Sequence, residues 1–194
     1  GIRCSDGWLD THSLDEVGVS AFLLNACKSY EQGRALVEKG AIGGIVTVAD
    51  LLNKTATKLG RTIAFLIDAG FSLSTSLEIL DRQSIVGNHY LIVGDGSMQV
   101  VESQTGTPYL AKMKNENNNF NVQYEFYPSR NYGPGSLVTP KINKEKIRYI
   151  AGDKTKWFKL SKSSLNKFIL KHGFPIEYDG SIYWSEEFPT ERLD

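Results

Sequence analysis

The chain has 194 residues, which is enough for one large domain or two small ones. Lys and Arg together number 22, as do Asp and Glu, so the charge balance argues against nucleic acid or an anionic membrane as a partner. Two cysteines do not make a disulfide framework, and the sequence contains neither a long apolar run nor a signal peptide. These properties predict a soluble cytoplasmic protein. Because the chain opens at Gly1 without a methionine, we expect it to be a fragment.

The first half of the sequence alternates between strand and helix patterns. Short apolar runs predict buried strands, and helical periodicity predicts amphipathic helices. The predicted strands are residues 20–26, 43–48 and 90–93, and the predicted helices are residues 30–39, 53–69 and 74–82. Strands that alternate with helices of this length pair in parallel through right-handed crossovers. The pattern therefore predicts an α/β domain over residues 1–103.

Residues 104–194 show a different pattern. Residues 120–127 alternate between apolar and polar side chains, as expected for a half-buried antiparallel strand. Asp179 and Gly180 predict a hairpin turn, and residues 161–171 predict one helix. Further predicted strands are residues 109–114, 147–150, 157–160, 176–178 and 182–184. We therefore expect a small β-rich accessory domain with one helix. Its expected core includes Trp157, Tyr183 and Trp184, and a platform for a ligand is the alternative role of these side chains.

Cys27 lies directly after the predicted strand 20–26 and shortly before the predicted helix 30–39. This position is the carboxyl end of a central strand, where reacting groups collect in open α/β sheets. The partial positive charge of a helix N-terminus also favours a thiolate nearby. The position alone leaves two interpretations open. Cys27 is a catalytic nucleophile, or it is a small buried hydrophobic residue, as free cysteines usually are.

A more specific signal comes from the order of several segments along the chain. They are Leu24-Asn25-Ala26-Cys27-Lys28-Ser29 with the helix after it, Gly43-Gly44-Ile45-Val46-Thr47, the long helix between Asn53 and Gly70, and Tyr90-Leu91-Ile92-Val93-Gly94-Asp95-Gly96. In this order they resemble the C-terminal part of a caspase-like peptidase domain of the CHAT type, which is related to caspases, separases and gingipains. The resemblance covers about half of the chain. It implies a partial caspase-like sandwich with a mainly parallel sheet, in which Cys27 is the nucleophile of a cysteine endopeptidase.

The opening residues extend the resemblance. Residues 1–10 are similar to the small hairpin that follows the catalytic histidine in this family, and residues 11–17 to the helix that leads into the cysteine strand. The resemblance therefore implies a His-Gly motif just before Gly1, in an upstream part of the same polypeptide or in a companion chain. That histidine would act as the general base, and the Cys27 amide would contribute to the oxyanion hole.

Asp50 follows the predicted strand 43–48, at the position where the resemblance implies recognition of a basic substrate residue. A carboxylate there would bind Arg or Lys through a charge-assisted contact. Asp is also a preferred N-terminal cap, so capping of the next helix is the alternative. Asn53 has two similar interpretations, as a residue at the rim of the substrate site or as the helix cap.

The chain has three histidines, and we expect structural roles for them. His12 follows the hairpin, His89 precedes the last strand at the end of the sheet opposite the active end, and His172 ends the helix of the second domain. None has metal-ligand spacing with a cysteine, and no glycine-rich phosphate motif is present, so we expect neither a metal nor a cofactor. Cys4 is expected to pack in the hairpin. Asp95 is a turn residue or, because it directly follows a strand, faces the active end.

We therefore expect the cysteine-bearing part of a CHAT-type cysteine endopeptidase, a hydrolase that cuts protein or peptide substrates after a basic residue. Two alternatives belong to other classes. A catalytically silent CHAT-like module would serve as an interaction scaffold. A doubly wound domain would bind a small ligand at its glycine turns, Gly43-Gly44 and Gly94-Asp95-Gly96.

Overall fold

The computed structural model describes residues 2–4, 6–50, 52–82, 89–116, 119–142, 145–169 and 173–190. The chain forms two compact units, one from Gly1–Ile67 with Ser72–Val100 and the other from Asp68–Phe71 with Val101–Asp194. Both units contain helices and strands, and some strand pairs are parallel, so the protein is mixed α/β, as the sequence predicts. In the described part of the chain, no helix is long and apolar enough to cross a membrane.

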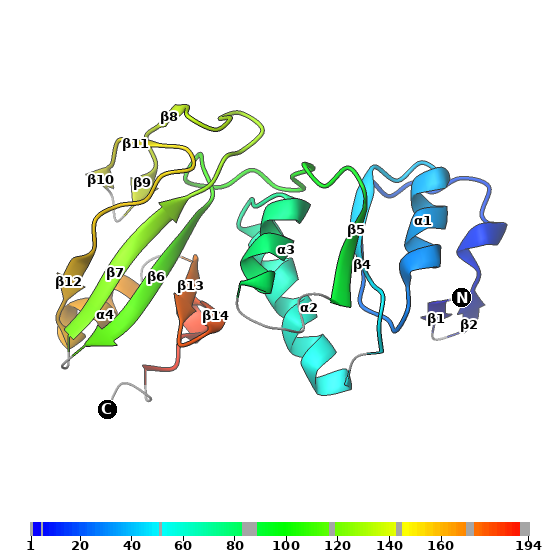
Figure 1. Ribbon diagram of the computed structural model, residues 1–194, viewed down its shortest axis with the longest axis horizontal. Helices are drawn as coiled ribbons and strands as arrows, with labels where there is room; N and C mark the ends of the chain where they lie inside the picture. Colours follow the sequence, from blue (N-terminus) through cyan, green and yellow to red (C-terminus); the bar gives the residue numbers. More distant parts are fainter. Residues whose placement is uncertain are drawn as a thin grey trace. The chain divides into compact units, whose positions relative to one another are not determined.

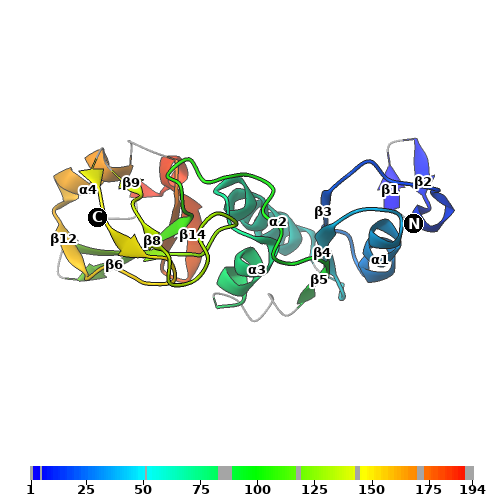
Figure 2. The ribbon, with the colours of Figure 1, turned by 90° about the horizontal axis from the view of Figure 1, so that it is seen from above.

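The first unit has its sheet between two layers of helices. Its elements are β1 (Ile2–Cys4), β2 (Gly7–Leu9), η1 (Thr11–Ser13), β3 (Ala21–Leu24), α1 (Tyr30–Glu38), β4 (Gly43–Thr47), α2 (Asn53–Asp68), α3 (Leu73–Asp81) and β5 (Tyr90–Gly94). The strand order of the sheet is β3-β4-β5. Helix α1 covers one face, and α2 and α3 cover the other (Figure 1). The hairpin of β1 and β2 lies on the α1 side (Figure 2).

The direction of β5 differs from the sequence prediction. β3 and β4 are parallel, with Leu23 opposite Ile45, but β4 and β5 are antiparallel, with Ile45 opposite Ile92. One helix connects β3 to β4 and returns the chain to the end of the sheet where β3 began. Two successive helices connect β4 to β5, so the chain enters the sheet again from the other end. The prediction of parallel pairing throughout is therefore wrong for β5, because two helices between strands do not make a single crossover.

The segment before β3 is also only partly as predicted. β1 and β2 form the expected antiparallel hairpin. The helix expected at residues 11–17 is wrong, because this segment contains a single 3-10 turn, η1, whose N-cap is Asp10. The next residue, Leu14, is extended, and the Val17 N–H donates to the Lys39 carbonyl at 3.0 Å. A bond to the end of α1 takes the place of the local bonds that a helix would need.

β4 is the central strand, and all five of its residues are buried. Two glycines allow close packing on it: a Cβ atom at Gly44 would clash with the Phe22 ring, and one at Gly33 of α1 would clash with Val46. On the other face, β4 and β5 pack against α2 and α3. The buried apolar cluster there consists of Ile45, Leu59, Ile63, Leu73, Leu77, Leu80 and Tyr90. This cluster excludes water from the α2 and α3 side of the sheet.

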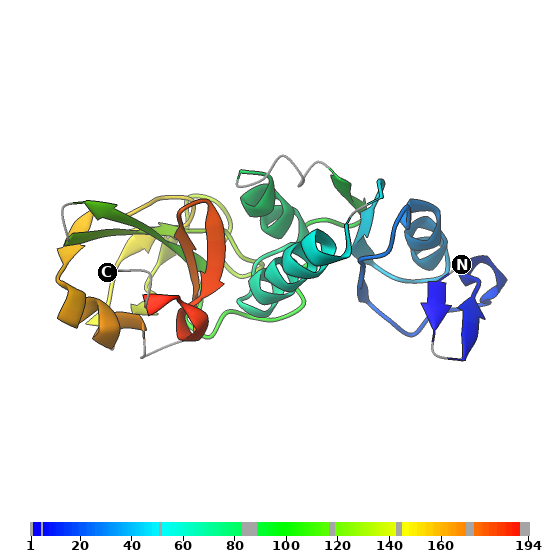
Figure 3. The same cartoon turned by 90° about the horizontal axis from the view of Figure 1, so that it is seen from below.

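The second unit is β-rich, as predicted. Its elements are β6 (Tyr109–Glu116), β7 (Asn119–Phe126), β8 (Leu137–Val138), β9 (Lys141–Ile142), β10 (Glu145–Lys146), β11 (Tyr149–Ile150), β12 (Phe158–Leu160), α4 (Lys162–Ile169), β13 (Pro175–Tyr178), β14 (Ser181–Trp184) and η3 (Ser185–Glu187). Its largest sheet has the order β12-β7-β6-β13-β14 and is antiparallel except between β6 and β13. Helix α4 packs against β7 and β12 (Figure 3). Asp179 and Gly180 have φ values of 47° and 63° and form the predicted turn between β13 and β14.

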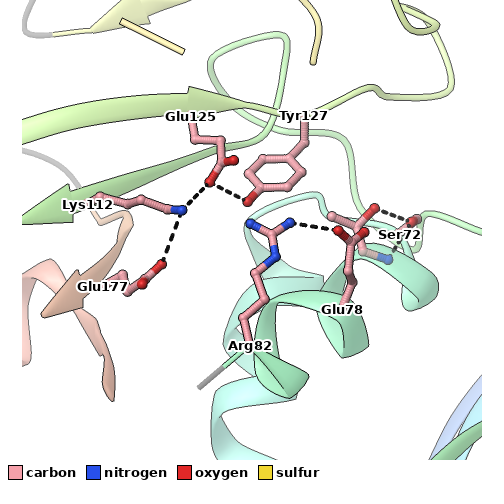
Figure 4. Close-up of polar contacts among 8 residues, drawn as sticks. Ser72, Glu78, Arg82, Lys112, Glu125, Tyr127 and Glu177 are labelled. Atoms are coloured by element: carbon pink, nitrogen blue, oxygen red, sulfur yellow. Dashed lines mark hydrogen bonds and ion pairs between the residues drawn. The ribbon is translucent and has the colours of Figure 1, made fainter. Parts of the chain in front are cut away.

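The two faces of this sheet differ in polarity. One face carries an aromatic core, which includes Tyr109, Phe120, Tyr124, Phe126, Phe168 and Phe174. On the other face, Lys112 Nζ lies 2.9 Å from Glu125 and 3.9 Å from Glu177, and the Tyr127 hydroxyl donates to Glu125 at 2.9 Å (Figure 4). Trp157 is 41% exposed, with the Lys114 ammonium 5.0 Å from its ring centroid. The expectation that Trp157 belongs to the core is therefore wrong.

Candidate active site

Cys27 lies in the loop between β3 and α1, and its side chain is exposed. The N-cap residue of α1 is Ser29, so Cys27 is two residues before the cap. Because β3 and β4 are parallel, the loops that follow them lie at the same end of the sheet. The exposed side chain contradicts the interpretation of Cys27 as a buried packing residue.

Ser29 fastens the Cys27 loop to β4 through its hydroxyl. Ser29 Oγ donates to the Leu24 carbonyl at 2.8 Å and accepts from the Thr47 N–H at 3.0 Å. Thr47 Oγ1 lies 3.1 Å from Ser29 Oγ and donates to the Ala26 carbonyl. Ser29 and Thr47 are 2% and 1% exposed, so these bonds satisfy polar groups that water cannot reach. The backbone on both sides of Cys27 is therefore held in place.

Asn25 fastens the beginning of the same loop to α2 and β5. Its Nδ2 donates to the Ala56 carbonyl at 2.7 Å, and the Tyr90 hydroxyl donates to its Oδ1 at 2.7 Å. The Tyr90 hydroxyl is protonated at neutral pH, as tyrosines ordinarily are, and burial raises its pKa further, to about 12. A Cβ atom at Gly60 would clash with Asn25 Nδ2. The glycine therefore leaves the room that the asparagine side chain needs on α2.

The sequence patterns did not predict the polar residues of this network, which are Asn25, Ser29, Thr47 and Tyr90. Ser29 precedes a helix, which predicts a cap, yet its hydroxyl makes no capping bond. The signal that could have found the network is a polar residue at the end of a buried apolar strand, because such a residue must find a partner. Thr47 ends β4 and Asn25 follows β3, so both fit this pattern.

An ion pair with Lys28 connects Asp50 to the Cys27 loop. Lys28 Nζ is 2.9 Å from Asp50 Oδ2, and the two side chains are 69% and 67% exposed. The hydrogen bond and the charge of Asp50 raise the pKa of Lys28. Lys28 also has a φ of 53°, in the left-handed region that residues other than glycine rarely adopt. Asn53 is the first residue of α2, and its contact with a substrate stays a prediction.

The reversed direction of β5 changes the place of His89. Because β5 is antiparallel to β4, its first residues lie at the end of the sheet where Cys27 lies. The Val48 N–H accordingly donates to the His89 carbonyl at 2.9 Å. The prediction that His89 lies at the opposite end is therefore wrong. Its Nδ1 is buried and has no hydrogen-bond partner among the described residues.

The same reversal places Asp95 at the other end of the sheet. The Asp95 N–H donates to the carbonyl of Ile42, the residue before β4, at 2.9 Å. The Asp95 carboxylate accepts from the Ser97 N–H and hydroxyl, and these bonds lower its pKa. Asp95 is thus a turn residue, and the expectation that it faces the active end is wrong.

The remaining candidates lie away from this network or outside the described residues. His12 lies in η1, where its backbone N–H donates to the Asp10 carboxylate at 3.0 Å. Cys4 is the last residue of β1. His172 lies outside the described residues. In the parts of the chain that the structure describes, no group of three or more His, Cys, Asp or Glu side chains could hold a metal ion.

Comparisons with known proteins assign no family to this chain, so its class is described from the fold and the site alone. No family model matches the chain, and neither the curated proteins nor the solved structures contain a match. The fold and the site describe a mixed α/β protein with an exposed cysteine after a strand of a parallel pair, on a loop that buried polar side chains fasten.

Proposed function

We propose that this chain is the cysteine-bearing part of a CHAT-type, caspase-like cysteine endopeptidase that acts in the cytoplasm. The loop of Cys27 carries the proposal, because the side chain is exposed while buried hydrogen bonds hold the backbone around it. A nucleophile needs both a defined position and access to the substrate. A cysteine that only packs needs neither.

In the proposed reaction, the Cys27 thiolate adds to the scissile carbonyl carbon, and negative charge develops on the carbonyl oxygen. The Cys27 amide donates a hydrogen bond to that oxygen. Collapse of this intermediate breaks the C–N bond, and a histidine protonates the leaving amine. Water then hydrolyses the thioester and regenerates the thiol. The histidine comes from an upstream part of the same polypeptide or from a companion chain.

The proposed substrate is a protein or peptide with Arg or Lys before the cut. Asp50 supplies the carboxylate for this side chain, and Asn53 lies at the rim of the same site. The position of Asp50 in the loop after β4, beside the Cys27 loop, supports this role. A guanidinium binds a carboxylate through two parallel hydrogen bonds, which favours Arg.

The test is the rate at which iodoacetamide labels Cys27 in the parent protein, with its histidine present, at about pH 6.5, where ordinary thiols with a pKa of about 8.5 are mostly protonated. We expect fast labelling that Cys27→Ala abolishes and that Cys4→Ala, the matched control, preserves. Replacing the upstream histidine in the parent protein should slow it. The fast-labelling protein should then cleave peptides with Arg or Lys before the cut.

The main alternative is a catalytically silent CHAT-like scaffold, and one observation favours it. The carboxylate proposed to recognise the substrate already has a cationic partner, Lys28. Labelling of Cys27 no faster than that of an unactivated exposed thiol would favour this alternative over the peptidase.

A further inference from the structure

Lys28 and Asp50 form an ion pair directly beside the proposed nucleophile, 2.9 Å from nitrogen to oxygen. We propose that Lys28 is an internal substitute for the basic side chain of a substrate, and that a substrate must displace it from Asp50 to bind. This inference rests on the proposed function, in which Asp50 recognises Arg or Lys. It adds a competing residue within the chain that sets the affinity of that recognition.

The backbone around Lys28 keeps its side chain near Asp50. Lys28 lies between Cys27 and Ser29, and the Ser29 hydroxyl is buried and bonded to Leu24 and to Thr47. Lys28 itself has the left-handed φ of 53°. The backbone is held at Ser29 and is left-handed at Lys28. These two constraints restrict the directions that the lysine side chain can take.

The charges of the pair resemble those of the proposed complex with a substrate. The Lys28 ammonium donates to a carboxylate at the distance of a charge-assisted bond, as the ammonium of a substrate lysine would. Lys28 is charged at neutral pH, as lysines ordinarily are, and Asp50 raises its pKa further. The carboxylate is therefore already neutralised before a substrate arrives.

The exposure of the pair makes this competition reversible. Both side chains are more than two-thirds exposed, and ion pairs in such surroundings contribute little free energy because water screens them. Lys28 should therefore weaken the binding of a basic side chain about two- to fivefold without preventing it. A guanidinium with its two parallel bonds is better suited to displace an ammonium than another ammonium is.

The experiment measures protection of Cys27 by a small mimic of the substrate side chain. Nα-acetyl-arginine amide is titrated into the parent protein with its histidine present, and the rate of Cys27 labelling by neutral iodoacetamide is followed. Nα-acetyl-citrulline amide, which has nearly the same shape but no charge, is the ligand control. The rate is measured with and without the amide in each variant, so changes in the intrinsic reactivity of Cys27 cancel.

Three variants separate the contributions to binding. Lys28→Met should lower the concentration of the arginine amide needed for half protection about two- to fivefold. Asp50→Asn should abolish protection. Lys54→Met removes the same charge from an exposed position of α2 and should behave as the wild type.

The outcomes distinguish this inference from the proposed function. If wild type and Lys28→Met need the same concentration of the arginine amide for half protection, the proposed competition is overturned, but Asp50 remains the recognition residue. Protection that survives Asp50→Asn, or that the citrulline amide also gives, overturns the role of Asp50 and the competition with it. Slow labelling of Cys27 in the absence of any amide counts against the peptidase itself.

Discussion

Ser29 shows how one buried hydroxyl can define the surroundings of a neighbouring thiol. Its oxygen is bonded both to the strand that leads into the Cys27 loop and to the strand beside it. Because Ser29 is 2% exposed, water cannot replace either bond. The exposed cysteine therefore lies between backbone groups that buried hydrogen bonds hold in place.

Ser29→Ala should lower the free energy of unfolding of the first unit by about 1–3 kcal/mol, because it leaves the Thr47 N–H without its partner. Hydrogen exchange of the β4 amides measures this unit separately. Ser13→Ala removes a hydroxyl from an exposed position and should change stability by less than about 0.5 kcal/mol. An equal effect of the two substitutions would contradict the importance of the buried network.

His89 lies at the same end of the sheet as Cys27, but β4 separates their strands. The His89 Nδ1 is buried and has no hydrogen-bond partner among the described residues, whereas the Cys27 side chain is exposed. His89→Gln should therefore leave the labelling rate of Cys27 unchanged at about pH 6.5. A loss of tenfold or more would instead identify His89 as the base and remove the need for a histidine from outside the chain.

At the scale of elements, a glycine in helix α2 makes room for a contact with the loop of Cys27. Asn25 reaches the backbone of α2 at Ala56, and it can do so because Gly60 has no side chain. Glycine costs a helix interior about 1 kcal/mol relative to alanine. We infer that the contact with Asn25 offsets this cost.

Gly60→Ala should lower the free energy of unfolding of the first unit by about 1–3 kcal/mol, although alanine is the better helix former. In the background of Asn25→Ala the clash is gone, and the same substitution should be neutral or stabilising. Urea unfolding of the four proteins of this cycle, monitored through the β4 amides, measures the difference. Stabilisation by Gly60→Ala in the wild-type background would disprove the steric argument.

At the scale of the whole molecule, both units bury tyrosine hydroxyls. Burial raises the pKa of Tyr90 to about 12 in the first unit, and it raises those of Tyr109 and Tyr124 in the second. The ordinary value is about 10. The folded protein therefore holds these protons more tightly than the unfolded chain does. Their contribution to stability is complete below about pH 10 and is lost as the pH rises through the folded values.

The protein should therefore keep its full unfolding free energy at pH 9 and lose part of it by pH 11, as measured by urea unfolding. Absorbance at 295 nm should show that some of the nine tyrosines ionise only as the fold is lost. Tyr90→Phe should reduce the loss at alkaline pH. Tyr132→Phe, at a side chain that is 39% exposed, should not. Ionisation of all tyrosines near pH 10 in the folded protein would contradict this expectation.

The sequence by itself determined where most elements lie. The strand before Cys27, the helix after it and the long helix α2 are present close to the predicted bounds, and so is the turn at Asp179 and Gly180. Their signals are local, because periodic burial and turn chemistry depend on neighbouring residues. The segment of residues 11–17 is one exception, since the resemblance implied a helix there and the Val17 N–H instead bonds to the distant Lys39.

Only the tertiary structure decided which side chains surround Cys27. The antiparallel direction of β5 places His89 at the end of the sheet where Cys27 lies and Asp95 at the other end, and no local pattern encodes that direction. The bonds of Ser29 with Thr47 and of Asn25 with Tyr90 span 18 and 65 residues. Partners this far apart in sequence meet only when the crossover helices and the strand order are in place, because these set which loops share an end of the sheet.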